Sequence, residues 1–253
     1  MRTNRNHHDE NGCNRSHTHM PDGRVIYTAD TTPHTDAHHH HHHHPSPSGT
    51  DEEQAAFFDD CAEQNLMADF LPEEQDRFNE MYDKWQIKEG MTVIEPGCGQ
   101  GRLTERLAKS VGKNGMVWAC DLSSKMLNRA ATRLTAQGLM PQTKLFQGSI
   151  LNMPLPLATA DRVIMFSVYP HFADKAEVLR TAARAMNATG ELWIAHLHNR
   201  QQMNEFHRNA GHVVENHILP DRDEIKATIE QAGLIFVDYE ERDGWYTVHA
   251  KKR

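Results

Sequence analysis

The pattern of apolar and polar positions along the chain changes at residue 51. The first fifty residues have almost no clustered apolar residues, and twelve of the nineteen histidines lie among them. Such a segment cannot bury enough apolar surface to offset the entropy lost on ordering. We therefore expect residues 1–50 to be a disordered, histidine-rich tail and residues 51–253 to form one domain.

Helical spacing of apolar residues predicts two helices at the start of this domain. They cover 51–71 and 72–87, and Pro72 with two acidic residues after it suits the first turn of the second helix. Candidate apolar lid surfaces on these helices are Phe57, Phe58, Met81 and Trp85. Residues at this spacing belong more often to a core.

From residue 91 onward, short apolar runs alternate with amphipathic stretches. Strands are predicted at 91–96, 115–121, 143–148, 161–168 and 190–197, and helices at 101–111, 123–138 and 174–186. Strands that alternate with helices imply right-handed crossovers and a parallel sheet covered on both faces. The predicted fold class is therefore α/β.

The C-terminal part breaks this alternation. A polar insertion, residues 199–221, is long enough to cap a pocket, and a helix is predicted after it at 222–233. Two strands, 234–241 and 244–252, then follow each other with only a short turn between them. This arrangement predicts an antiparallel hairpin at the edge of the sheet.

Composition and charge narrow the class of partner. The formal net charge is −8, and no basic stripe with interleaved aromatic residues is present, which argues against nucleic acid. The N-terminus lacks the apolar core of a signal peptide, and no apolar run approaches the ~20 residues that span a bilayer. Four cysteines without paired metal-site spacing suit a reducing compartment. We expect a soluble, cytoplasmic protein that acts on a small molecule.

A glycine-rich turn follows the first predicted strand, in the sequence VIEPGCGQGRLTERLA of residues 93–108. Ligands of open α/β sheets bind beyond the carboxyl ends of the strands. Gly97, Gly99 and Gly101 permit positive φ and have no Cβ, so a ligand can approach the backbone and the N-terminus of the next helix. The turn is predicted to make room for a ligand.

Asp121 ends the second predicted strand, twenty residues beyond Gly101. A carboxylate at this place meets the two vicinal hydroxyls of a ribose. Capping of the next helix is the weaker interpretation, because Ser123 already suits that role. The glycines fall as G-x-G-x-G rather than as the G-x-G-x-x-G of a dinucleotide turn, which favours an adenosyl ligand.

Five stretches of this sequence resemble the class I S-adenosylmethionine-dependent methyltransferase family. They are VIEPGCGQGRLTERLA, VWACDLSSKML, LFQGSILNMPLP, DRVIMFSVYPHF and ATGELWIAHLH. The chain is most similar to the broad group that includes ubiquinone- and menaquinone-biosynthesis enzymes. The resemblance extends from residue 91 to the C-terminus. It implies a Rossmann-like, seven-stranded, mostly parallel sheet with an antiparallel last strand, and S-adenosylmethionine as the cofactor.

The resemblance also implies the residues that bind this cofactor. They are Glu95, Gly97, Cys98, Gly99, Gly101, Asp121, Leu122, Met126, Ser149, Ile150 and Phe166. Glu95 and the backbone of the glycine turn would hold the methionine part, and Asp121 the ribose. Leu122 and Met126 would lie beside the adenine. Where the family has an acidic residue for the adenine amino group, this chain has Ser149 as its nearest hydrogen-bonding side chain.

Methyl transfer from a sulfonium is an in-line displacement, which needs a base only if the nucleophile must lose a proton. His171, just after the fourth predicted strand, is the leading candidate base. An imidazole can take a proton from a phenol, thiol or enol. Tyr169 is the second catalytic candidate, because the family's methyl donor faces its acceptor there. A structural role at a helix entry is the alternative for His171.

Further histidines gather in and near the insertion. The ionisable residues are His196, His198, Glu205, His207, His212, Glu215 and His217. On a strand, His196 and His198 would point the same way. The set could be a metal site, a proton-handling pocket or a polar lid. Its scattered spacing is a poor metal signature, so we favour lid or substrate contact and expect no metal site in the domain.

Seven consecutive histidines, residues 38–44, belong either to a natural tail or to a purification tag. Neutral imidazoles in a flexible run bind divalent metals, so physiological metal handling is a separate hypothesis.

The sequence as a whole predicts a methyltransferase that uses S-adenosylmethionine and a small-molecule acceptor. The alternatives are a metal-handling protein that keeps the fold without transferring a methyl group, and a nucleotide-dependent oxidoreductase.

Overall fold

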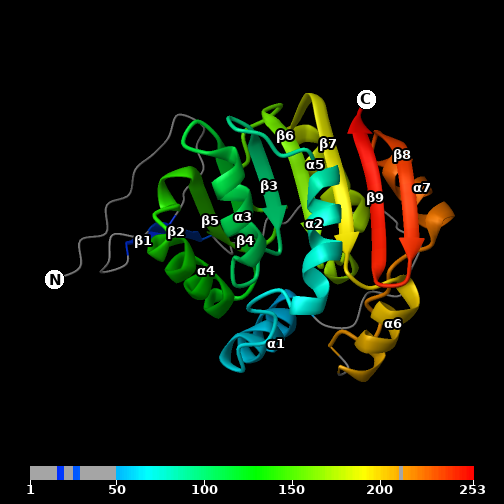
Figure 1. The fold of residues 1–253 in the computed structure, drawn as a ribbon, viewed down its shortest axis with the longest axis horizontal. Helices are drawn as coiled ribbons and strands as arrows, with labels where there is room; N and C mark the ends of the chain where they lie inside the picture. Colours follow the sequence, from blue (N-terminus) through cyan, green and yellow to red (C-terminus); the bar gives the residue numbers. More distant parts are fainter. Residues whose placement is uncertain (1–15, 20–24, 29–49, 211–212) are drawn as a thin grey trace, which may run out of the picture.

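A mostly parallel sheet with an antiparallel edge lies at the centre of the fold (Figure 1). The computed structural model describes residues 16–19, 25–28, 50–210 and 213–253. The parallel strands are β3 (Thr92–Pro96), β4 (Met116–Asp121), β5 (Thr143–Gln147), β6 (Ala160–Phe166) and β7 (Met186–His196). The antiparallel edge consists of β8 (Leu234–Arg242) and β9 (Trp245–Lys252).

Helices connect and cover these strands. They are α1 (Asp51–Glu63), α2 (Gln75–Lys84), α3 (Arg102–Val111), α4 (Ser124–Ala136), α5 (Lys175–Ala185), α6 (Arg200–Asn209) and α7 (Arg222–Gln231). Within the described ranges, none of them is both long and apolar enough to cross a lipid bilayer.

The order of the strands reverses beside β3. From β3 the chain passes through α3 to β4 and through α4 to β5, and it then returns to β6 on the other side of β3. The resulting order is β5-β4-β3-β6-β7-β9-β8, with β9 antiparallel between β7 and β8. The predicted seven-stranded α/β fold is confirmed. Ligands of such sheets bind at the reversal point, here beyond the carboxyl ends of β3 and β6.

Two short strands extend this sheet within the segment that was expected to be disordered. β1 (Ser16–His19) pairs antiparallel with β2 (Val25–Thr28), and β2 pairs parallel with β5. β2 contains the β-forming residues Val25, Ile26 and Tyr27, and the edge of β5 offers unpaired N–H and C=O groups for backbone pairing. Apart from these two strands, residues 1–49, including the seven-histidine run, lie outside the described residues, and there the tail stays a prediction.

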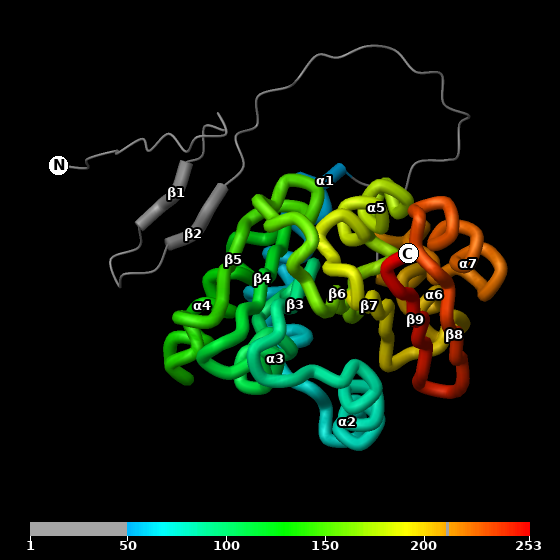
Figure 2. Tube along the Cα trace, turned by 90° about the horizontal axis from the view of Figure 1, so that it is seen from above, coloured from blue at the N-terminus to red at the C-terminus, as the bar shows by residue number. Residues whose placement is uncertain are grey.

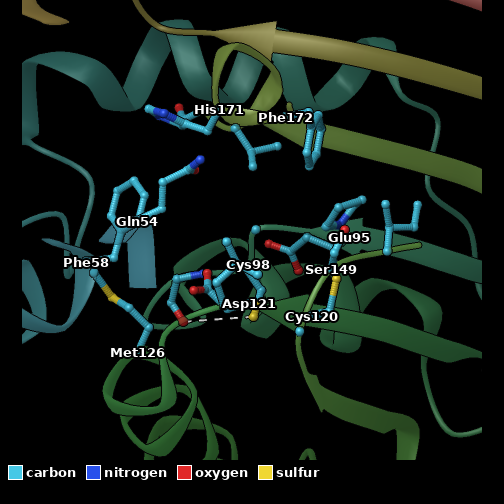
Figure 3. A pocket seen from close by; sticks show the side chains of 18 of the residues that line it. Gln54, Phe58, Glu95, Cys98, Cys120, Asp121, Met126, Ser149, His171 and Phe172 are labelled. Atoms are coloured by element: carbon cyan, nitrogen blue, oxygen red, sulfur yellow. Dashed lines mark hydrogen bonds between the residues drawn. The ribbon is translucent and has the colours of Figure 1, made fainter. Parts of the chain in front are cut away.

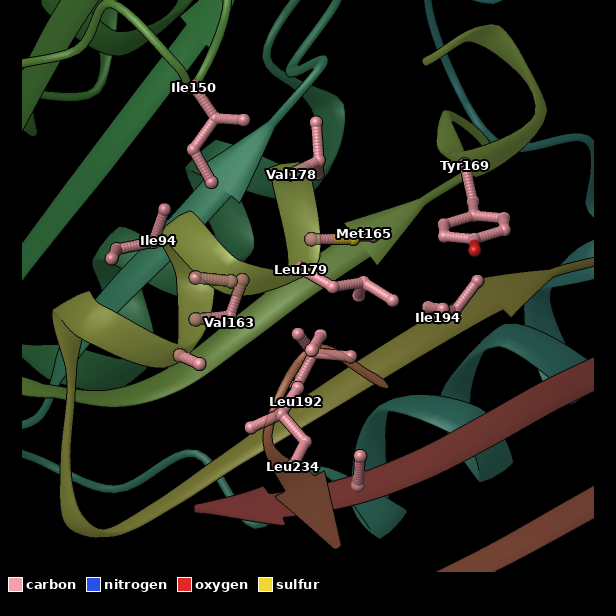
Figure 4. Close-up of a cluster of buried hydrophobic side chains, with 14 of the residues drawn as sticks. Ile94, Ile150, Val163, Met165, Tyr169, Val178, Leu179, Leu192, Ile194 and Leu234 are labelled. Atoms are coloured by element: carbon pink, nitrogen blue, oxygen red, sulfur yellow. The ribbon is translucent and has the colours of Figure 1, made fainter. Parts of the chain in front are cut away.

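Alternating side chains of the central strands enter two separate hydrophobic layers. Along β6, Val163 and Met165 belong to one layer, and Ile164 and Phe166 belong to the other. The first layer packs against α5 and α7, and the second packs against α2, α3 and α4 (Figure 2). Figure 4 shows the first layer. Burial on both faces explains why these strands appear as nearly continuous apolar runs.

The two N-terminal helices differ in position. Met81 of α2 and Trp85 at its end are fully buried in the second layer, so for them the core interpretation holds and not the lid. Helix α1 packs against α4, where the Asp59 carboxylate accepts from the Lys125 backbone N–H at 3.1 Å. Both α1 and α6 lie beyond the end of the sheet toward which β3 and β7 point (Figure 1).

Candidate functional site

A cavity lies where the strand order reverses. One wall, called the strand-end wall below, consists of residues that end or follow β3, β4 and β5. The opposite wall, called the His171 wall, consists of residues after β6 together with Gln54 and Phe58 from α1. In Figure 3, His171 and Phe172 lie across the cavity from Asp121.

The glycine-rich turn after β3 belongs to the strand-end wall. Gly97 and Gly99 have φ values of 69° and 53°, which residues with side chains rarely adopt. A Cβ on Gly97 would lie 2.3 Å from Cγ2 of Val168, so only glycine lets this turn approach the loop after β6 so closely. Gly97, Cys98 and Gly99 all line the cavity.

Gly101 is glycine for a different reason. It is not among the described residues that line the cavity. It is the N-cap of α3 with a φ of 80°, and a Cβ there would lie 3.0 Å from Cα of Ala130 in α4. The predicted cofactor contact of Gly101 is therefore corrected: this glycine allows α3 to pack closely against α4.

Asp121, at the end of β4, has a carboxylate that the backbone holds in place. Oδ2 accepts from the Gly99 N–H at 2.8 Å, and Oδ1 accepts from the Ser123 N–H at 2.9 Å. Burial raises the pKa of Asp121 to about 6, although these two hydrogen bonds act in the opposite direction. Each oxygen keeps a further lone pair, so the carboxylate can accept from two hydroxyls of a ligand.

Ser123 is the N-cap of α4, as the sequence predicted. Its side chain accepts from the backbone N–H of Met126 at 3.0 Å. The side chain of Asp121 is therefore not needed as the N-cap of α4.

Glu95, in β3, is a buried carboxyl group with an incomplete set of partners. Its exposed fraction is 2%, and Oε2 has no hydrogen-bond partner among the described residues. Burial raises the pKa of Glu95 to about 8, and the negative charge of Asp121 adds to this rise. Buried carboxylates require a donor or a positive charge. Because Glu95 lines the cavity, an ammonium group of a ligand would meet that requirement.

Most of the other predicted cofactor residues also line the cavity. They are Leu122, Met126, Ser149, Ile150 and Phe166. Ser149 Oγ accepts from the Leu151 N–H at 3.3 Å and keeps a second lone pair for a ligand. Sequence reasoning missed Gln54, Val168 and Phe172, which also line it. No local pattern relates these residues to the glycine turn, because tertiary packing alone brings them there.

His171 lines the cavity from η3 (Tyr169–His171), the 3₁₀ turn after β6. Its Nδ1 lies 2.8 Å from Nδ1 of His217, and the ring of Phe58 packs edge-on at 5.3 Å between centroids. Burial lowers the pKa of His171 well below its ordinary value, and the neighbouring histidines lower it further. The neutral imidazole is therefore the resting form near pH 7, which is the form that a base requires.

Tyr169 does not join His171 in the cavity. Its side chain is fully buried in the first hydrophobic layer, where Figure 4 shows it near Ile194, and it is not among the described lining residues. Burial also raises the pKa of its hydroxyl well above the ordinary value. The geometry gives Tyr169 no route to a ligand, so the second catalytic candidate is corrected to a core residue.

The insertion forms α6 and a turn after it, and it brings two histidines to His171. His207 and His217 are 3% and 0% exposed, whereas Glu205 and Glu215 are exposed. No described residue of the insertion lines the cavity. The described part of the insertion therefore contacts His171 and does not itself cover the cavity.

Of the remaining histidines, His196 lies close enough to His171 for its charge to affect the pKa of His171, whereas His198 is exposed. β7 ends at His196, so the expectation that His196 and His198 point the same way is wrong: the first is 1% exposed and the second is exposed. His212 lies outside the described residues. In the part of the chain that the structure describes, no three His, Cys, Asp or Glu side chains are arranged to hold a metal ion.

Comparisons with known proteins point in the same direction as this geometry. Residues 87–233, more than half of the chain, match the family described as "Methyltransferase domain". The ubiquinone/menaquinone biosynthesis C-methyltransferase of Citrobacter koseri is 26% identical in an alignment of 175 residues that covers 60% of this chain and 70% of that protein. The demethylmenaquinone methyltransferase of Lactobacillus johnsonii is 30% identical over 113 residues, which are 45% of this chain and 46% of that protein.

A solved structure shares the fold. The S-adenosylmethionine-dependent methyltransferase from Aquifex aeolicus has a TM-score of 0.56 and 23% identity, and the match covers 72% of this chain and 98% of that one. None of these matches favours a metal-handling protein or an oxidoreductase. The unpartnered oxygen of Glu95 and the open lone pairs of Asp121 fit the ammonium and ribose groups of S-adenosylmethionine. The chain belongs to the class I S-adenosylmethionine-dependent methyltransferases.

Proposed function

We propose that the strand-end wall binds S-adenosylmethionine through two carboxylates. Asp121 would accept from the ribose hydroxyls, and Glu95 would accept from the ammonium group of the methionine part. Leu122 and Met126 would pack beside the adenine. When bound, the cofactor supplies an electrophilic methyl group on a sulfonium. Because Gly97 has no Cβ, the methionine part of the cofactor would lie directly against the backbone of this turn.

We infer that the acceptor is a small molecule with a weakly acidic group. The His171 wall offers apolar contacts from Phe58 and Phe172 and one neutral imidazole. An imidazole base helps when a hydroxyl, thiol or enol must lose a proton as it is methylated. Because the relative from Citrobacter koseri is named a C-methyltransferase, a phenolic or enolic ring methylated on carbon is the first acceptor to test.

A single observation carries this proposal. One cavity holds a buried carboxyl group with one unpartnered oxygen and a carboxylate with open lone pairs, and a neutral histidine lies across from them. The first two suit the cofactor and the third suits an acidic acceptor.

The test is a methylation screen with the full chain and S-adenosylmethionine labelled in its methyl group. Phenols, enols, thiols and amines are offered in parallel, and products are identified by mass spectrometry. We expect labelled product from the phenols, enols or thiols. Turnover of amines alone would contradict the proposed acceptor class, while leaving the cofactor assignment intact.

The compartment and the tail are separate questions. Cys61, Cys98 and Cys120 are free and buried, which supports a reducing compartment. We propose that the seven-histidine run binds divalent metal ions through its neutral imidazoles. Replacing these seven histidines with alanine should abolish nickel binding by the full chain and spare methyl transfer, and loss of transfer would contradict their separation.

A further inference from the structure

The histidines behind His171 are ordered by the backbone. The rings of His171 and His217 lie 5.0 Å apart between centroids, with the two Nδ1 atoms 2.8 Å apart. Nδ1 of His207 in α6 is hydrogen-bonded to the backbone carbonyl of His217. The N–H of His217 donates to the Val214 carbonyl at 2.9 Å. The turn after α6 therefore holds the His217 ring against His171.

The bond between the two Nδ1 atoms restricts the proton positions. A neutral imidazole carries one N–H, so one ring must donate its Nδ1–H and the other must present a bare Nδ1. If His171 donates, its Nε2 is bare and can accept a proton. If His217 donates, the proton of His171 sits on Nε2, and that nitrogen cannot act as a base. Since Nδ1 is occupied, Nε2 is the nitrogen left for a ligand.

We propose that His217 positions His171 for catalysis: it accepts the Nδ1–H of His171 and thereby keeps Nε2 of His171 bare toward the acceptor. This inference rests on the proposed function. In the transfer step, the proton of the acceptor goes to Nε2 as the new bond to the methyl carbon forms, and the sulfonium S–CH3 bond breaks to leave a thioether. The positive charge that leaves sulfur is thus matched by an imidazolium, whose Nδ1–H remains bonded to His217.

The groups around the pair support this assignment. Besides His217, the groups whose charge acts on the pKa of His171 are Lys175 in α5, His196 at the end of β7 and His207 of α6, while Asp51 of α1 and Asp174 line the same cavity. Asp174 is engaged as the cap of α5 through the Glu177 N–H, and Lys175 donates to the carbonyl of Phe172 at 2.9 Å. Burial lowers the pKa of His196 to about 3. His217 is therefore the side chain that contacts Nδ1 of His171.

Two substitutions separate positioning from packing. His217→Asn places an amide oxygen near the position of Nδ1 and can accept the same hydrogen bond. His217→Phe keeps the ring volume and removes the acceptor. His198→Gln is the matched control, because His198 is exposed and lies outside the cavity.

The first measurement needs no acceptor molecule. ¹⁵N NMR of the ligand-free full chain reports the imidazole tautomers, and the signals of His171 are those lost in His171→Gln. We expect the Nδ1–H tautomer of His171 in the wild type, in His217→Asn and in His198→Gln, and a shift toward Nε2–H in His217→Phe. An Nε2–H tautomer in the wild type, or the same tautomer in the wild type and His217→Phe, would overturn the proposal. If His217→Phe does not fold, the wild-type spectrum decides.

The second measurement uses an acceptor turned over in the labelled-methyl screen. We expect His217→Phe to lower kcat about 10- to 100-fold with KM unchanged, and His217→Asn to recover most of the loss. Wild-type kcat in His217→Phe would contradict the role of His217. S-Adenosylhomocysteine, measured by calorimetry, should bind all these variants like the wild type. Failure of the wild type to bind it would instead contradict the proposed function.

Discussion

One stretch of sequence encodes the strand-end wall, whereas the His171 wall is assembled from segments far apart in the chain. Glu95, Gly97 and Asp121 belong to two consecutive strand–turn units, and backbone hydrogen bonds fix the carboxylate of Asp121. In contrast, His171 follows β6 and meets Phe58 from α1 and His217 from the turn after α6. The proposed cofactor site is thus encoded locally, while the proposed acceptor site depends on tertiary packing.

Replacing His171 should produce the largest effect on catalysis. It should change the His171 wall and leave the strand-end wall unchanged. His171→Gln removes the base, so we expect kcat to fall about 100- to 1,000-fold. Affinity for S-adenosylhomocysteine should not change, because His171 lies across the cavity from the carboxylates. Since the pKa of His171 is lowered, wild-type kcat should be flat near pH 7 and fall only in acid. Kinetics from pH 5 to 8 check this, and a wild-type rate in the variant would exclude His171 as the base.

Glu95→Gln should stabilise the ligand-free protein while it weakens cofactor binding. The folded protein keeps a proton on Glu95 up to a pKa of about 8, whereas the unfolded chain loses it near the ordinary value. The wild-type free energy of unfolding therefore falls as pH rises through this window. The variant should equal the wild type near pH 5 and exceed it by about 3 kcal/mol at pH 8.

Urea unfolding of both proteins at the two pH values measures this difference. Asp121, whose pKa is raised to about 6, contributes to the pH dependence of both proteins, and because its charge acts on Glu95 this contribution cancels only in part. If the variant is no more stable than the wild type at pH 8, burial does not raise the pKa of Glu95 in the folded protein.

Asp121→Ala should weaken S-adenosylhomocysteine binding about 10- to 100-fold, the value of one or two charge-assisted hydrogen bonds. Calorimetry measures the dissociation constant directly. Asp238→Ala, which removes an exposed carboxylate on β8, is the matched control and should bind like the wild type. Equal affinity in the two variants would contradict the ribose contact.

The smallest effect concerns the packing of α3 on α4. Gly101→Ala combines a left-handed φ with a Cβ 3.0 Å from Ala130, whereas Gly90→Ala has a similar φ and no atom within 4 Å. Strain alone costs about 1–2 kcal/mol in either variant. We expect Gly101→Ala to lose about 1 kcal/mol more than Gly90→Ala in denaturant unfolding, because of the extra crowding. Equal losses of stability in the two variants would show that the packing of α4 does not require glycine at position 101.

The same contrast explains how much the sequence could predict. Gly97 and Asp121 line the cavity at the strand ends because a strand, a tight turn and a helix start fix their positions locally. Gly101 was assigned to the wrong partner, since its constraint comes from Ala130 in another helix. Tyr169 and His171 are two residues apart, and only the 3₁₀ turn between them decides which one enters the core.

The His171 wall was largely beyond prediction for the same reason. Gln54 lines the cavity because α1 packs on α4, a contact that no sequence period reveals. His217 was recognised as a candidate in a histidine-rich insertion, but its direct contact with His171 depends on how α6 folds back. The parallel α/β sheet followed from the alternation of strands and helices. β1 and β2 were missed because they are four-residue segments within a polar, histidine-rich stretch, although β2 contains Val25, Ile26 and Tyr27.

The most direct test of the central claim is a crystal structure of the full chain with S-adenosylhomocysteine. We predict that the ribose hydroxyls lie within hydrogen-bonding distance of Asp121 and that the amino group meets the unpartnered oxygen of Glu95. We also predict that the sulfur faces the His171 wall. A ligand bound elsewhere, or a cavity that stays empty at saturating concentration, would contradict this account.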